Sequence, residues 1–485
     1  MRRLVAGILA ALALALLAAG CGGSSKKSGS ASGSGGAASL VPADATAYVA
    51  INTDLSSDQW KTLNSLLDKF PSKDQLLAMF RGELQKQGVD WNNDVKPALG
   101  PELDVAAITD AAGRTQPVAF LQPKDEGKLN ALLQKGSGTH PVHEKVGDWT
   151  VVAEKQTTID AVKQAENGKS IADNSGFSDA MGKLPSETVA KFYVAGSRLT
   201  QTLGQSLGAA SAALPATSSL QYVTGALTSH DDGLKLEGTA KTSKKAPASG
   251  TYKSSLVGDA PAGAYLFLSF HGLDSAVSQL RSNPSLQQQL PQVEQALGVT
   301  LDQLAALFKD EVAIYVRAGT PIPEITLVSK VDDTQQAQAT IDKLASRAGA
   351  FAGGAAPKPV TVAGVAAKEL TIGGRFSIFY AAFDGKLVIT SAQTGISGLK
   401  ESGPRLADDA TFKDATSAAG MPDETSGFVY LNLKDSIPLI ESAAQLGGQT
   451  IPSNVGGNLE PLHAFVAYAK SSGDEAGFTA FLQVK

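Results

Sequence analysis

Short runs of alternating apolar and polar residues recur along the chain, separated by segments whose apolar residues are spaced as on a helix. The runs 221–240 and 464–484 each contain a turn signal near their middle, Asp-Asp-Gly at 231–233 and Ser-Gly-Asp at 472–474. Alternation on both sides of an Asp-Gly or Gly-Asp pair is typical of β-hairpins. The pattern therefore predicts antiparallel sheet with hairpin-linked strands.

Three segments carry apolar residues along one face of a predicted helix. The stripes are Trp60, Leu63, Leu67 and Phe70, with Pro71 as the stop; Leu286, Leu290, Val293 and Leu297; and Ala337, Ile341, Leu344 and Ala348. Such a stripe can line a ligand groove, but apolar faces at this spacing usually pack against a core. We expect these helices to cover a sheet.

The same order of landmarks occurs twice in the sequence. The paired landmarks are 40–51 and 259–268, 102–106 and 310–314, the helices 125–134 and 333–348, the runs 147–152 and 384–389, Phe177 and Phe412, and Pro185 and Pro422. Each series ends in one of the two hairpins. The sequence therefore predicts an α+β fold of two tandem homologous units, 40–245 and 250–485, each an antiparallel sheet packed on one face by amphipathic helices.

The first twenty residues have the parts of a secretory signal peptide. A Met-Arg-Arg start precedes an apolar run over residues 4–19, and small residues lead to Cys21. The run is shorter than the ~20 residues that span a bilayer. We therefore predict that residues 1–20 are a cleaved signal peptide.

Cys21 is the only cysteine of the chain. It follows Leu-Ala-Ala-Gly at 17–20, which resembles the lipobox of bacterial lipoproteins, although such signals usually carry Leu at the place of Ala18. The resemblance implies a diacylglycerol on Cys21, and two acyl chains hold a protein on a membrane more stably than one. Residues 21–39, rich in Gly, Ser and Ala, would form a flexible tether. We therefore expect a protein anchored on the outer face of the cell membrane.

A family resemblance follows from three features together. Val-Pro-Ala-Asp-Ala at 41–45, the segment 94–103 and the lipoprotein leader resemble bacterial lipoproteins of the domain of unknown function 3352 family, found largely in exported proteins of high-GC Gram-positive bacteria. The resemblance covers nearly the whole chain after the tether, and the second copy departs from it with Gly263 in place of Asp44. It implies an exported, membrane-tethered protein and supplies no activity or functional residues.

Composition argues against one class of partner. The 485 residues are 43% hydrophobic and 18% charged, with a formal net charge of −5. These values are typical of a globular protein with a core. Because no basic stripe is present, we expect no nucleic-acid partner.

Two motifs are weak candidates for chemistry. Ser206, in Gly-Gln-Ser-Leu-Gly at 204–208, matches the nucleophile elbow of serine hydrolases, but an elbow needs a strand running directly into it, and the strand-like run 192–195 ends well before. His140 and His143 form the only close histidine pair, whereas zinc needs three or four converging ligands. We therefore expect no catalytic residues, no metal and no cofactor.

The favoured hypothesis is an exported, lipid-anchored envelope lipoprotein that binds an unknown protein or apolar ligand without catalysis, with a crevice between its two units as a natural binding place. One alternative is an exported serine or metal-dependent hydrolase built on Ser206 or on His140 and His143. Another is a structural or regulatory module that docks on a membrane protein through a sheet edge. Fluorophosphonate labelling of Ser206, or stoichiometric zinc, would favour the hydrolase.

Overall fold

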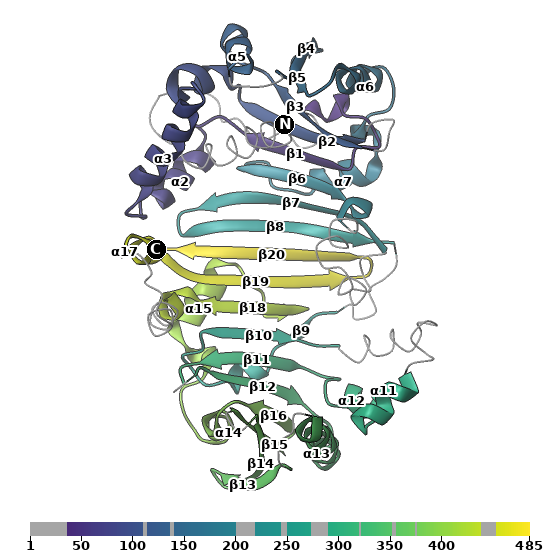
Figure 1. Ribbon diagram of the computed structural model, residues 1–485, viewed down its shortest axis with the longest axis vertical. Helices are drawn as coiled ribbons and strands as arrows, with labels where there is room; N and C mark the ends of the chain where they lie inside the picture. Colours follow the sequence, from purple (N-terminus) through teal and green to yellow (C-terminus); the bar gives the residue numbers. More distant parts are fainter. Residues whose placement is uncertain are drawn as a thin grey trace. The chain divides into compact units, whose positions relative to one another are not determined.

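The computed structural model describes residues 36–109, 114–135, 140–199, 219–243, 250–272, 290–319, 322–351, 356–373, 376–437 and 453–485. The contacts divide the chain into two compact units, whose helices and strands are labelled in Figure 1. Unit 1 comprises Met1–Lys244, Thr450–Leu462 and Gly477–Lys485, and unit 2 comprises Lys245–Gln449 and His463–Ala476. Cys21, the preceding signal segment and Ser206 lie outside the described residues.

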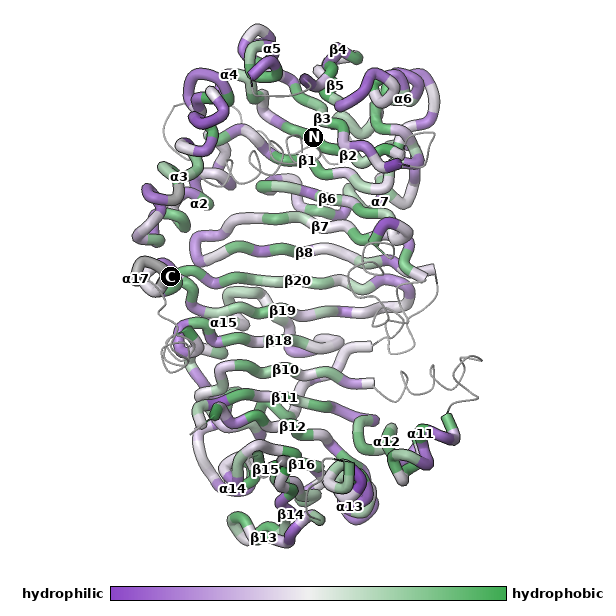
Figure 2. Tube along the Cα trace, viewed as in Figure 1, coloured by the Kyte–Doolittle hydropathy of each residue, from purple (hydrophilic) through white to green (hydrophobic). Residues whose placement is uncertain are grey.

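Unit 1 contains an antiparallel sheet in the order β4-β5-β3-β2-β1-β6-β7-β8. Its strands are β1 (Ala47–Asn52), β2 (Glu102–Thr109), β3 (Thr115–Leu121), β4 (Val142–Val146), β5 (Trp149–Ala153), β6 (Ala190–Ala195), β7 (Leu220–His230) and β8 (Gly233–Thr242). Asp231 and Asp232 join β7 to β8, as the turn signal predicts. Figure 2 shows the alternation of hydrophobic and hydrophilic residues along strands such as β8.

Helices pack on both faces of the unit 1 sheet. The helices of unit 1 are η1 (Ala37–Leu40), α2 (Asp58–Leu67), α3 (Lys73–Lys86), η2 (Trp91–Val95), α4 (Lys96–Ala98), α5 (Glu126–Leu133), α6 (Gln156–Glu166), η3 (Ile171–Asp173), α7 (Ser175–Gly182) and α17 (Ser453–Leu459). Tyr48 and Ala50 of β1 face a core with Ile159 of α6 and Phe177 of α7. Residues of the opposite parity, such as Leu103, face a second core formed with α2, η2 and α5. The prediction of a single covered face is therefore wrong for unit 1.

Unit 2 contains an antiparallel sheet in the order β13-β14-β15-β16-β12-β11-β10-β18-β19. Its strands are β10 (Leu266–Phe270), β11 (Val312–Arg317), β12 (Glu324–Lys330), β13 (Lys358–Val362), β14 (Val365–Ile372), β15 (Phe376–Phe383), β16 (Lys386–Thr390), β18 (Gly427–Asn432) and β19 (Leu462–Ser472), with the short pair β9 (Tyr252–Lys253) and β17 (Glu424–Thr425). The last strand, β20 (Glu475–Val484), follows β19 after Gly473 and Asp474.

Helices also lie between the strands of unit 2. They are η6 (Leu256–Gly258), α11 (Leu290–Leu297), α12 (Leu301–Ala306), α13 (Thr334–Phe351), α14 (Gln393–Lys400), η7 (Leu406–Asp408) and α15 (Ala410–Ala418). α13 packs on the sheet through Ala337, Ile341 and Ala345, which join Leu370 and Tyr380 in one core. Among the described residues, no helix combines the length and the apolar character that crossing a bilayer requires.

The two units share strand order and individual hydrogen bonds. β1 lies between β2 and β6, as β10 lies between β11 and β18. Equivalent backbone bonds run from Ile171 N to Val41 O at 2.7 Å and from Leu406 N to Ala260 O at 2.8 Å. Pro42 and Pro261 also make equivalent isolated bridges, to Ser170 and Arg405. The chain is therefore an α+β protein of two tandem homologous units, as predicted.

Other details of the sequence predictions also need correction. α2 ends at Leu67, so Phe70 lies beyond the helix that we expected to continue to Pro71. Val293 of α11 is 42% exposed rather than part of a core, and Leu286 lies outside the described residues. The strand pairing aligns Leu103 with Val312, so Glu102 corresponds to Glu311, one residue later than the sequence match placed it.

Candidate functional site

The two histidines proposed as metal ligands lie at the start of an edge strand. His140 is exposed, with its Nδ1 3.2 Å from the carbonyl oxygen of Leu133, and His143 is half-buried in β4. The neighbouring Glu144 accepts hydrogen bonds from Lys163 and Gln156, which lower its pKa. Within the described part of the chain, no group of three or more His, Cys, Asp or Glu is placed to hold a metal ion.

A buried carboxyl cluster, formed by Tyr48, Glu102, Asp104 and Lys191, is the most unusual polar feature of unit 1. Glu102 and Asp104 alternate along β2 and therefore lie on the same face of the sheet. Ala50 of β1 pairs with Asp104 on one side and with Lys191 of β6 on the other, which brings the two charged residues onto that face. Glu102 is 5%, Asp104 0% and Lys191 4% exposed. Charged groups are rarely this buried unless they are paired.

Electrostatics in the carboxyl cluster favour a retained proton. Burial, together with the negative charge of Glu102, raises the pKa of Asp104 well above its usual value. Burial also raises the pKa of Tyr48, whose hydroxyl donates to Asp104 Oδ2 at 2.6 Å. The pKa of Lys191 is lowered by its burial, while Glu102 opposes that shift. Two adjacent buried carboxyls resist double ionisation, so the pair holds one proton to a higher pH than either would alone.

The first described residues of the chain cover this cluster. The backbone N–H of Ala37 donates to Asp104 Oδ2 at 2.9 Å, and Ala37 and Ala38 are fully buried. A Cβ on Gly36 would lie 2.6 Å from Glu102 Oε1 and 2.9 Å from Asp104 Oδ2, so any larger residue at position 36 would displace these carboxyls. Residues 36–39, which we predicted as the last part of the flexible tether, are therefore held on the folded unit by the buried carboxyls and by the burial of Ala37 and Ala38.

Unit 2 has a carboxylate at the equivalent place, with different partners. Glu311, in the position of Glu102, accepts hydrogen bonds from the hydroxyls of Ser254, Ser255 and Ser269 and from the backbone N–H of Ser255 and Leu256. The Tyr252 hydroxyl lies 2.6 Å from Ser269 Oγ, and burial raises the pKa of Tyr252 to about 12. Glu311 is therefore a fully hydrogen-bonded single carboxylate, whereas unit 1 has two adjacent carboxyls.

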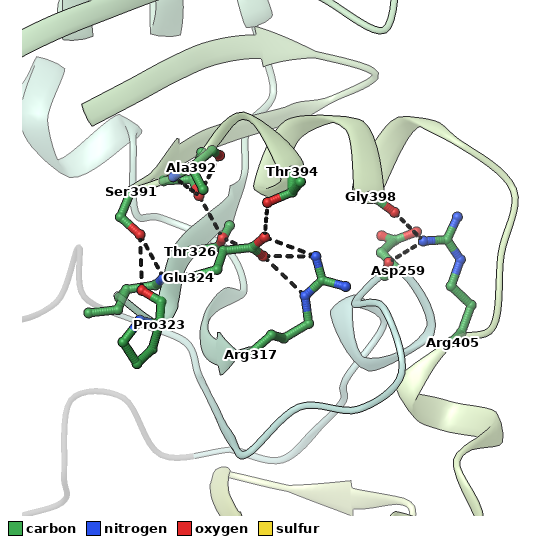
Figure 3. Close-up of polar contacts among 12 residues, drawn as sticks. Asp259, Arg317, Pro323, Glu324, Thr326, Ser391, Ala392, Thr394, Gly398 and Arg405 are labelled. Atoms are coloured by element: carbon green, nitrogen blue, oxygen red, sulfur yellow. Dashed lines mark hydrogen bonds and ion pairs between the residues drawn. The ribbon is translucent and has the colours of Figure 1, made fainter. Parts of the chain in front are cut away.

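A second polar network, the Arg317–Glu324 network, lies beneath α14 in unit 2 (Figure 3). Arg317 of β11 donates two hydrogen bonds to Glu324 Oε1, at 3.1 and 3.0 Å, and a third to Oε2 at 3.0 Å. The hydroxyl of Thr394 in α14 donates to Glu324 Oε2 at 2.5 Å. Such a bidentate arginine–carboxylate pair is strong and directional. The Glu324 side chain is 1% and the Arg317 side chain 21% exposed.

Two threonines and a glycine complete the Arg317–Glu324 network. Thr326 and Thr390 face each other with their hydroxyl oxygens 2.8 Å apart, and Thr326 also donates to Glu324 Oε1 at 3.3 Å. A Cβ on Gly395 of α14 would lie 2.1 Å from Thr390 Oγ1 and 2.6 Å from Thr326 Oγ1. The absent side chain lets α14 approach the sheet closely. The network therefore fixes α14 on β12 and β16.

Only faint sequence signals indicate these clusters. Glu102 and Asp104 stand as polar residues at alternate positions of an otherwise apolar strand, which marks a buried pair but does not identify Tyr48 or Lys191 as neighbours. Their chemistry is that of proton retention and of fixing segments together. None of these residues was among the candidates from the motif search, and the structure does not bring Glu102 or Asp104 together with His140 or His143 in a metal-binding group.

The fold places the chain in the class of α+β proteins built from two tandem homologous units. Comparison with known families then identifies its family. The chain matches the family described as protein of unknown function (DUF3352) over residues 4–145 and 128–476, and it belongs to that family. No curated protein matches it.

Solved structures similar to this chain include three crystal forms of TP0453. Form IV is 12% identical, with 47% of this chain and 93% of that chain covered and a TM-score of 0.24. Form III is 13% identical, with 44% and 74% covered and a TM-score of 0.23. Form I is 14% identical, with 48% and 80% covered and a TM-score of 0.26.

Proposed function

We propose that this protein is an exported envelope lipoprotein, acylated on Cys21, that acts on the outer face of the cell membrane as a non-catalytic binding protein. The single observation that carries the proposal is the order of segments at the start of the sequence: signal peptide, lipobox-like cysteine and tether. Its partner is a protein or an apolar ligand, and no cofactor takes part.

The position of the first described residues supports the proposal. Gly36 and Ala37, at the end of the predicted tether, are held over the buried carboxyl cluster, so at most residues 21–35 separate the acylated cysteine from the folded unit. Residues 21–36 reach at most about 50 Å when fully extended. With a flexible-chain average of roughly 20 Å, an acylated Cys21 would keep the body close to the membrane surface.

The roles of the buried polar residues also fit a binding protein. In the described residues, the carboxyl cluster holds the first segment, Glu311 holds η6 and Glu324 holds α14. Each of these carboxyls therefore stabilises packing between elements. None needs to take part in chemistry for its burial to be explained.

Substitution of Cys21 tests the anchor. We expect wild-type protein expressed in a bacterial host to partition into the detergent phase of Triton X-114, and C21A to move to the aqueous phase. The substitution A18L, which supplies the leucine usual in a lipobox, is the matched control and should retain or increase processing. Mass spectrometry should find a diacylglyceryl group on the N-terminal peptide of wild type. An unmodified thiol on freely soluble protein would overturn the proposal.

The binding role needs a separate experiment on the acylated protein. Crosslinking in isolated envelopes, followed by mass spectrometry, should recover one reproducible partner or a co-purifying apolar molecule. If the protein is recovered with neither a crosslinked partner nor a co-purifying apolar molecule, the result would contradict a binding role. Labelling of wild type but not S206A by a fluorophosphonate would instead establish the hydrolase alternative.

A further inference from the structure

Unit 2 carries an extension that unit 1 lacks. α5 of unit 1 has 8 residues and β4 begins shortly after it, at Val142. The corresponding α13 has 18 residues, and the hairpin of β13 and β14 is inserted before β15. β4 corresponds to the second half of β15, because Val142 pairs with Ala153 as Phe379 pairs with Thr390. The end of α13, β13, β14 and the start of β15 are therefore additions to the shared fold.

Two phenylalanines are exposed on this extension. Phe351, the last residue of α13, is 80% exposed, and Phe376, the first residue of β15, is 59% exposed. Removing a phenylalanine ring from water is favourable. Two exposed rings on one surface therefore indicate an interaction site, whereas apolar residues exposed singly are common on protein surfaces. We call these two residues the aromatic tip.

The packing of α13 on β15 places both rings at the same end of the extension. Gln338 accepts a hydrogen bond from Ala382 N at 2.8 Å, and Asp342, four residues later, pairs with Lys368, which lies opposite Tyr380. α13 and β15 therefore run alongside each other in opposite chain directions. From that level, Phe351 lies about 13 Å further along the helix. Phe376 lies about 13 Å further along the strand, so both rings belong to one end.

The same extension carries exposed cations for which no acidic partner is found among the described residues. They are Lys343 and Arg347 on α13 and Lys358 at the start of β13. The acidic side chains of the same extension are engaged: Asp342 pairs with Lys368 at 2.8 Å, and Glu369 accepts from Ser377 Oγ at 2.5 Å. The exposed charge on the extension is therefore positive.

We propose that the aromatic tip is a second, peripheral contact with an anionic lipid surface, made by inserting Phe351 and Phe376 among the headgroups while the cations bind phosphate. Aromatic rings and lysines or arginines on one surface are the chemistry of membrane-interface binding, which needs no complementary groove. The inference rests on the proposed lipid anchor, because a tether raises the effective concentration of a weak contact. A protein partner would be an alternative occupant, which the vesicle experiment excludes or reveals.

The test uses the chain from residue 21 with C21S, which keeps every described residue and removes the acyl chains. Its sedimentation with phosphatidylcholine vesicles containing 30% phosphatidylglycerol is compared with sedimentation with phosphatidylcholine alone. We expect binding to the anionic vesicles, and a loss of at least about tenfold in the partition coefficient for F351S/F376S. K343Q/R347Q should lower binding to anionic vesicles several-fold and leave any binding to neutral vesicles unchanged.

The matched control is M79S, because Met79 in unit 1 is also exposed, at 67%. It should bind like the parent chain. Equal binding by F351S/F376S and the parent, or no binding by the parent to anionic vesicles, would overturn the inference. Circular dichroism of each variant checks the fold. The two proposals can be rejected separately. Finding Cys21 unmodified together with tip-dependent vesicle binding would overturn only the lipid anchor. Finding Cys21 acylated without tip-dependent vesicle binding would overturn only the role of the aromatic tip.

Discussion

Units 1 and 2 place different chemistry at the same two cross-strand positions. The corresponding pairs are Ile108–Gln116 and Val118–Ala153 in unit 1, and Arg317–Glu324 and Thr326–Thr390 in unit 2. In unit 1, Ile108, Val118 and Ala153 belong to the hydrophobic core. In unit 2 the same backbone holds a buried ion pair and two hydroxyls. The same fold therefore accommodates either apolar packing or a buried ion pair with two hydroxyls at these positions, provided that all four residues match one another.

The buried carboxyls at the positions of Glu102 and Glu311 also have different surroundings in the two units. Unit 2 surrounds Glu311 with serine hydroxyls and backbone N–H groups that donate to both of its carboxyl oxygens. Unit 1 places Asp104 beside Glu102, and burial together with that second carboxyl raises the pKa of Asp104. The same sheet position therefore holds one hydrogen-bonded carboxyl in unit 2 and two coupled carboxyls in unit 1.

Breaking the ion pair of unit 2 should have the largest effect. E324A leaves Arg317 partly buried without its carboxylate, and we expect a loss of about 3 kcal/mol in the free energy of unfolding. Chemical denaturation followed by circular dichroism measures it.

Exchanging all four residues at these positions tests whether they must match one another, rather than be charged. R317I/E324Q/T326V/T390A installs the residues of unit 1 and should be more stable than E324A by about 1–3 kcal/mol, since apolar packing replaces a buried pair at little net cost. If the fourfold variant is less stable than E324A, the two units are not interchangeable at these positions.

Adding a methyl group at Gly395 should have an intermediate effect. Its Cβ would collide with Thr390 Oγ1, and we expect G395A to lose about 1–3 kcal/mol. G182A is the control, because Gly182 of α7 has no atom within 4 Å of the added Cβ. It should be neutral or slightly stabilising, as alanine favours helix. Thermal unfolding of both variants compares them. A G395A protein as stable as G182A would show that α14 does not need its close approach to the sheet.

Replacing Asp104 should change how stability depends on pH. The pKa of Asp104 is raised in the folded state, so the folded protein keeps a proton that the unfolded chain releases above about pH 4. This group therefore contributes stability at low pH that is lost as the pH rises toward the folded pKa, with a limiting slope of about 1.4 kcal/mol per pH unit. D104N removes this pH-dependent contribution to stability, because asparagine does not titrate. Urea unfolding between pH 4 and pH 7 should show wild type losing stability relative to D104N, and parallel profiles would contradict a retained proton.

Much of the fold followed from local pattern. The hairpin of β7 and β8 was predicted from alternation and a turn signal, and the long helix α13 from its apolar spacing, although Ala345 rather than Ala348 lies in the buried face. The exposure of Val293 was not predicted, because helical spacing identifies an apolar face without showing what lies opposite it.

By itself the sequence determined the duplication, the antiparallel α+β class and the presence of a lipobox-like cysteine, since each depends on residue order or on short-range periodicity. Only the tertiary structure decided that Asp104 meets Tyr48 and Lys191, and that Phe351 and Phe376 end at one level of the extension. The physical reason is that strands far apart in the chain pair through register. A shift of one residue would turn every side chain to the opposite face, and no local pattern specifies which distant strand supplies the partner.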